Sequence, residues 1–151
     1  MLTNKENVLK LYAAFDRGEF ELVRSMMSTD FIAHLVGMPA PLDREAFIQF
    51  GSEFRTAFPD GYHQFDEVIV EDNRVVTIGK FRGTHLGKFQ GLPATGKSVE
   101  IEVTHIDKLI DDRIVYHWGQ GNQAGMMQQL GIVFVPGLSL IAAAIRHQIR
   151  G

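Results

Sequence analysis

The spacing of hydrophobic residues changes from a helical period to a strand period near the middle of the chain. Apolar residues recur at three- and four-residue steps after a capping Thr3 or Asn4, again over 22–27, and again after Asp43. From Phe65 onward, apolar and polar side chains alternate, which is typical of strands with one buried face. The pattern therefore predicts three helices followed by a run of strands.

The stretch 98–121 predicts two strands joined by a tight turn at Asp111-Asp112. On the first strand Val103, His105 and Asp107 share a face with apolar neighbours. On the second strand Val115, His117 and Gly119 share a face. If these two faces look into the same interior, two imidazoles stand in an otherwise apolar space.

Other segments complete the predicted order of elements. We expect a short extended piece at 30–36, a strand pair at 65–70 and 74–81, a glycine-rich connection at 83–97, and a short helix capped by Asn122. Helices first and antiparallel strands later indicate an α+β fold. We expect a cone-shaped, curved antiparallel sheet wrapped around the N-terminal helices, in one domain over 1–151 with a C-terminal helical extension from about 136.

Composition narrows the function classes. The chain has 151 residues, of which 45% are hydrophobic and 22% charged, as in ordinary globular proteins. A net charge of -3 gives no reason to expect nucleic acid or a membrane surface as a partner. The absence of cysteine excludes disulfides and thiolate chemistry. Charges near the N-terminus stand where a signal peptide needs an apolar run, so we expect a cytoplasmic protein.

His105 and Asp107 are the candidate catalytic residues. An imidazole titrates near neutral pH, so His105 could take a proton from an acidic carbon or polarise a carbonyl, unless it is only a buried, hydrogen-bonded core residue. Asp107 could orient His105 or act as the base, because burial in apolar surroundings raises the pKa of a carboxyl. Alternatively Asp107 lies at a solvated strand end and pairs with Lys108 or Arg113.

Further residues are candidates for contacts with a ligand, and each has a purely structural alternative. They combine polar rings and amides with two rings of an aromatic ridge on the third helix: His34, His85, His117, Phe50, Phe54, Val103, Trp118 and Asn122. His63 and His147 have the pattern of surface residues. No spacing of histidines or acids predicts a metal site, and we expect no cofactor.

Several short segments occur in an order that resembles the SnoaL-like polyketide cyclase family, within the nuclear transport factor 2-like fold. They are the segments 57–60, 72–76, 83–87, 91–97, 110–119 and 128–131. The resemblance implies a cone-shaped α+β barrel with one deep apolar pocket, a homodimer or tetramer, and cofactor-free closure of a ring by intramolecular aldol condensation of a polyketide ester. It also implies a functional role for His105.

The chain departs from the family pattern at the catalytic acid. The aspartate that follows the His-Trp pair in the cyclases is Gly119 here, and the acid a few residues later is replaced by amides that include Asn122. In the cyclases a glutamine accompanies the histidine that matches His105, and Val103 stands at its position here. Glycine and amides cannot exchange a proton with carbon at neutral pH.

Three functions follow from these observations. The leading hypothesis is a cyclase- or isomerase-type enzyme that uses acid/base chemistry on a small hydrophobic carbonyl compound, with His105 as base or polariser. The second is a non-catalytic protein that binds a hydrophobic ligand, as the loss of the acid at Gly119 suggests. The third is a hydrolase of the epoxide hydrolase type, which needs a pair of carboxylates around a water.

Overall fold

Three helices form in the first part of the chain, and the first and third begin at side-chain caps that the sequence supplies. The computed structural model describes residues 1–132 and 136–149. Helix α1 spans Asn4–Arg17 and begins with Thr3 and Glu6 in a reciprocal capping box. Helix α2 spans Phe20–Met26, and α3 spans Arg44–Ala57 with Asp43 accepting a hydrogen bond from the N–H of Ala46.

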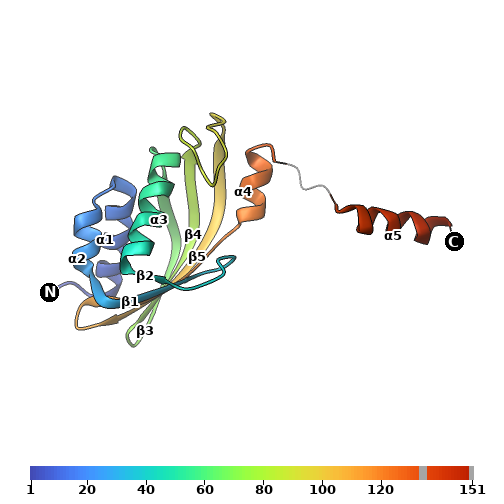
Figure 1. Cartoon of the computed structure of the whole chain (residues 1–151). Helices are drawn as coiled ribbons and strands as arrows, with labels where there is room; N and C mark the ends of the chain where they lie inside the picture. Colours follow the sequence, from blue (N-terminus) through green and yellow to red (C-terminus); the bar gives the residue numbers. More distant parts are fainter. Residues whose placement is uncertain (133–135, 150–151) are drawn as a thin grey trace.

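The strands form one six-stranded curved sheet (Figure 1). Two of them lie between α2 and α3 in the chain, and the other four follow α3. Its strands are β1 Met27–Leu35, β2 Leu42–Asp43, β3 Tyr62–Glu71, β4 Arg74–Thr84, β5 Ser98–Ile110 and β6 Arg113–Gly121. The order β2-β1-β6-β5-β4-β3 leaves the sheet unclosed. The α+β fold is confirmed, but the expectation of an entirely antiparallel sheet was wrong, because β1 pairs with β6 in parallel. Strand β1 therefore has the short antiparallel strand β2 on one side and the last strand, β6, on the other.

The hairpin of β5 and β6 forms as the sequence predicts, with one change of register. Asp111 and Asp112 both have positive φ, which matches the twist that a two-residue hairpin turn requires. A bulge then shifts the pairing, so that Leu109 faces Ile114 while Lys108 faces Tyr116. Ile114 is therefore buried in the core and Val115 is only half-buried, the reverse of the strict alternation expected for this strand.

Helices α1, α2 and α3 cover one face of the sheet (Figure 1). Two clusters of buried apolar side chains lie between the layers. One joins α1, α2 and α3 to β1, with Phe31 and Met27 fully buried. The other joins the end of α3 to β4 and β5 and to α4, which spans Gln123–Gln129, with Phe58 at its centre. This division positions the site, because the polar residues of the interior lie between the two clusters.

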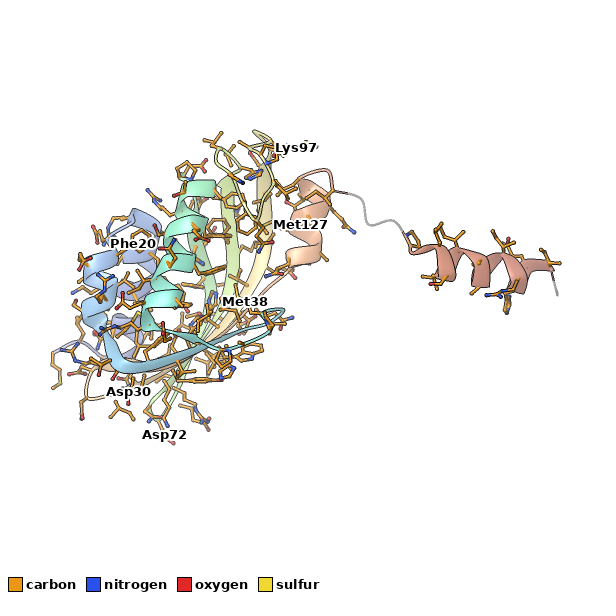
Figure 2. The ribbon with its side chains drawn as sticks, in the orientation of Figure 1. Phe20, Asp30, Met38, Asp72, Lys97 and Met127 are labelled. Carbon is orange, nitrogen blue, oxygen red and sulfur yellow. The ribbon has the colours of Figure 1, made fainter. Side chains whose placement is uncertain are left out.

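The last helix, α5, spans Leu138–Ile149 and has no buried residue. Its side chains stand clear of the other elements (Figure 2), so it does not complete the core. Within the described ranges, the structure holds no helix with both the length and the apolar character needed to cross a bilayer.

Candidate functional site

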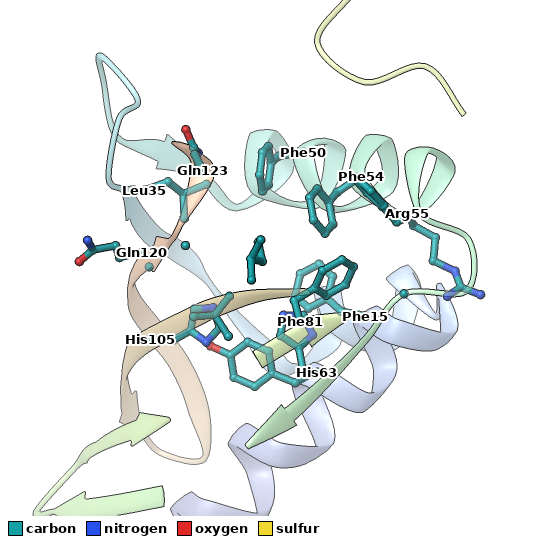
Figure 3. A pocket seen from close by; sticks show the side chains of 18 of the residues that line it. Phe15, Leu35, Phe50, Phe54, Arg55, His63, Phe81, His105, Gln120 and Gln123 are labelled. Carbon is teal, nitrogen blue, oxygen red and sulfur yellow. The ribbon is translucent and has the colours of Figure 1, made fainter. Parts of the chain in front are cut away.

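A cavity of about 160 Å³ lies between α3, α1 and the concave face of the sheet. Figure 3 shows Phe50 and Phe54 of α3 on one side and His105 of β5 on the other. Most of the lining is apolar or aromatic, and it includes Phe47, Phe58, Phe81, Ile101, Val103 and Met126. Phe50 and Phe54 of α3 thus line the hollow, and Phe58, just after the helix, lines it and is also buried in the core.

His105 forms part of the cavity wall and is only 8% exposed. Its ring stacks on Tyr12 at 4.8 Å between centroids, and its Nδ1 lies 3.2 Å from the hydroxyl oxygen of Thr77. Burial, together with the neighbouring imidazoles of His117 and His63, lowers the pKa of His105 well below its usual 6.5. The ring is therefore neutral at physiological pH, and it can donate or accept a hydrogen bond without carrying charge.

Asp107 is fully buried behind the cavity wall. One carboxylate oxygen accepts the hydroxyl of Tyr12 at 2.8 Å, and the other lies 2.8 Å from Nδ1 of His117. Burial and the charge of Asp107 raise the pKa of Tyr12 well above 10, so the phenol stays a donor. The expected alternatives for Asp107 were pairing with Lys108 or Arg113 at a solvated strand end, or orienting His105. The structure instead gives it His117 as partner, because cross-strand register places Asp107 directly opposite His117.

A second carboxylate and imidazole meet at another part of the cavity wall. Nδ1 of His63 lies 2.7 Å from a carboxylate oxygen of Asp16, and the other oxygen accepts the backbone N–H of His63 at 2.8 Å. Both residues line the cavity. The surface position expected for His63 was therefore wrong, since β3 starts at Tyr62 and carries this ring inward, against His105 at 5.7 Å between centroids.

Four of the expected ligand contacts lie outside the cavity lining. His34 and Trp118 occupy the opposite face of the sheet, where the ring of His34 packs against Tyr116. His85 is fully buried, but it faces Thr95 and Phe58. The side chain of Asn122 accepts the N–H of Gly125 as the cap of α4. These positions correct the expectation for all four residues, while Phe50, Phe54, Val103 and His117 do line the hollow.

Tyr12, Asp16 and His63 are the functional candidates that sequence reasoning missed. Tyr12 occupies an apolar position of α1, so the sequence pattern predicts a core residue. Only its hydroxyl indicates a polar contact, because a buried phenol needs a hydrogen-bond partner. Asp16 and His63 are 47 residues apart in the chain, and no local pattern links them. Within the described residues, no three histidines or carboxylates are placed to hold a metal ion together.

Fold and site together define a class: a curved-sheet α+β protein with an internal cavity in which imidazoles and an aromatic wall face one another. A family model for the SnoaL-like polyketide cyclases matches residues 6–130. The chain belongs to that family.

Named relatives agree with this assignment. The aklanonic acid methyl ester cyclase DnrD of Streptomyces peucetius is 26% identical over 135 residues, covering 87% of this chain and 92% of DnrD. The cyclase of the same name DauD, from Streptomyces sp. strain C5, is 27% identical over 133 residues, covering 82% of this chain and 79% of DauD. The crystal structure of IdmH from Streptomyces antibioticus superposes with a TM-score of 0.78 at 29% identity, covering 87% of this chain and all of that one (100%).

Proposed function

We propose that this protein is a cofactor-free cyclase- or isomerase-type enzyme that removes a proton next to the carbonyl of a small hydrophobic molecule. The observation that carries the proposal is the neutral, buried imidazole of His105 in the wall of an apolar cavity. A neutral imidazole in such a place can accept a proton from carbon or donate a hydrogen bond to a carbonyl oxygen, and both lower the barrier to enolate formation.

The size and lining of the cavity indicate the class of ligand. A space of about 160 Å³ holds roughly one aromatic ring. The rings of Phe50 and Phe54 offer flat surfaces for stacking. A planar carbonyl compound would enter with its reacting ring, while larger parts of the molecule would remain towards the Gln120 and Gln123 side.

The relatives suggest a first natural substrate. DnrD and DauD are named for aklanonic acid methyl ester, so we propose that compound, or a polyketide ester like it, as the substrate class. Intramolecular aldol closure leaves the mass unchanged, so conversion would be recorded as an isomer of altered chromatographic retention.

The general test uses 2-tetralone, a flat ketone with acidic hydrogens next to its carbonyl, in deuterium oxide. The proposal predicts deuterium uptake above the buffer rate, measured by mass spectrometry, and a loss of about tenfold or more in His105→Ala. Tetralone that binds, as seen by saturation-transfer NMR, but keeps its protons would contradict the proposal.

A second candidate is a non-catalytic protein that binds a hydrophobic ligand. The absence of an acid at Gly119 favours it. It predicts that His105→Ala weakens binding of 2-tetralone while neither the variant nor the wild type accelerates exchange.

A further inference from the structure

Gly119 has no side chain, and two imidazoles border its position in the cavity wall. It lies on β6 opposite His105 and beside Leu35 of β1, and it lines the cavity. A β-carbon at this position would lie 2.7 Å from Nε2 of His117 and 3.4 Å from Cδ2 of His105. The first distance is shorter than real β-carbons tolerate, so the ring of His117 already extends into the space that a side chain at 119 would fill.

The chain fixes which nitrogen of His117 carries the proton. Nδ1 lies 2.8 Å from the buried carboxylate of Asp107, an acceptor that also receives the Tyr12 hydroxyl. A carboxylate without a proton can only accept, so Nδ1 is the protonated nitrogen of the neutral ring. Nε2 then holds the lone pair, and it is the atom that points to the space over Gly119.

His105 presents a complementary edge to the same space. Its Nδ1 lies 3.2 Å from the hydroxyl oxygen of Thr77, and in the tautomer in which this hydroxyl donates to Nδ1 the ring proton is on Nε2, next to the Cδ2 atom that borders the space. In this tautomer, His117 offers a lone pair and His105 a donor to any atom placed over Gly119.

We propose that His117, held by Asp107 and Tyr12, is the base of this enzyme, and that His105 polarises the substrate carbonyl. The inference rests on the proposed function. It assigns the removal of the substrate proton to His117 instead of His105. It makes the glycine a requirement of the site, since any side chain there would displace the base.

The chemistry balances without a co-reactant. Nε2 of His117 takes the proton from the carbon next to the carbonyl, and the electrons of that C–H bond form the enolate, whose oxygen accepts a hydrogen bond from Nε2 of His105. In a ring closure, the enolate carbon then bonds to a second carbonyl carbon of the same molecule. The resulting alkoxide takes the proton back from His117, so the product is an isomer of the substrate. The hydrogen bond between Asp107 and Nδ1 of His117 stabilises the imidazolium between the two transfers.

Asp107→Asn tests the assignment in the 2-tetralone exchange assay. An amide can still accept the Tyr12 hydroxyl, but its NH₂ group would donate to Nδ1 of His117 and move the proton to Nε2, which removes the lone pair from the cavity. We expect exchange to fall about 100-fold, in the range found for loss of a general base. Asp66→Asn, the same change at an exposed site, and His34→Gln, on the outer face of the sheet, should exchange like wild type.

A second measurement covers the case in which Asp107→Asn fails to fold. Nitrogen-15 NMR of wild type should show the neutral ring of His117 protonated at Nδ1 and bare at Nε2. A proton on Nε2 would overturn the inference. Gly119→Ala should also lose exchange about tenfold or more, because its β-carbon collides with the base.

The outcomes separate this inference from the proposed function. Wild-type exchange with Asp107→Asn or Gly119→Ala equally active would refute His117 as the base and leave the acid/base enzyme standing with His105. No exchange by wild type would refute the proposed function itself. Restoration or increase of exchange by Gly119→Asp would indicate a site that merely lacks its acid, and would also refute the inference.

Discussion

Acid should destabilise this protein through His105. The ring is buried, and its pKa lies well below 6.5 because charging it would place a cation in the apolar wall beside two other imidazoles. In the unfolded chain the same ring binds a proton near its ordinary pKa. Between the two pKa values the unfolded state holds one more proton than the folded state. The contribution of His105 is therefore complete above pH 6.5 and is lost as pH falls below it.

The magnitude follows from proton linkage. One proton bound only by the unfolded state changes the free energy of unfolding by about 1.4 kcal/mol per pH unit. The full slope applies only below pH 6.5, where the unfolded ring is mostly protonated. If the folded ring stays neutral throughout, acidification from pH 7.5 to 5.0 therefore lowers the free energy of unfolding by about 2 kcal/mol. Carboxylates whose pKa values are lowered, such as Glu45 and Glu100, titrate below this window.

The assay is urea unfolding at several pH values, followed by the fluorescence of Trp118, the single tryptophan. His105→Phe keeps an aromatic ring next to Tyr12 and removes the titrating group, so it should lose about 2 kcal/mol less than wild type over this range. Val103→Ala removes volume from the same wall and no titrating group, so it should keep the wild-type pH dependence. An acid loss in His105→Phe equal to that of wild type would refute a neutral, buried His105.

The remaining predictions concern single contacts. Tyr12→Phe removes the donor to Asp107 and should cost about 1–3 kcal/mol in urea unfolding, with a several-fold drop in tetralone exchange; unchanged values for both would contradict the buried network. Phe58→Ala should cost about 3–5 kcal/mol, because Phe58 is 1% exposed at the centre of a core cluster, and a loss under 1 kcal/mol would place the ring elsewhere. Asp43→Ala should cost about 1 kcal/mol by removing the cap of α3. An unchanged urea midpoint would mean that the cap does not stabilise the helix. A chain ending at Gly137 should unfold at the same urea concentration as the full chain, since α5 has no buried residue; a lower midpoint would mean that α5 stabilises the core.

Much of the fold could be predicted because local signals and packing agree. The caps at Thr3 and Asp43 predict where α1 and α3 begin, and the alternation along β5 predicts which residues face inward. Two features had no such signal. The bulge in β6 changes which face Val115 occupies, and the parallel pairing of β1 with β6 depends on how the helices carry the chain around the sheet.

The site was only half predictable for a related reason. Strand parity places His105, Asp107 and His117 on the inner face, but it does not say which imidazole the carboxylate bonds. That depends on the register between β5 and β6, which puts Asp107 opposite His117 and His105 opposite Gly119. The Tyr12 hydroxyl and the Asp16–His63 pair come from elements that meet only after the sheet curves.

A crystal structure of the protein with 2-tetralone bound would show directly whether the two imidazoles face the reacting atoms. We expect the ring to lie against Phe50 and Phe54, with the carbonyl oxygen about 3 Å from Nε2 of His105 and the adjacent carbon over Gly119, facing Nε2 of His117. Tetralone bound only on the outer surface, or seated in the cavity with its carbonyl turned away from both imidazoles, would contradict this expectation.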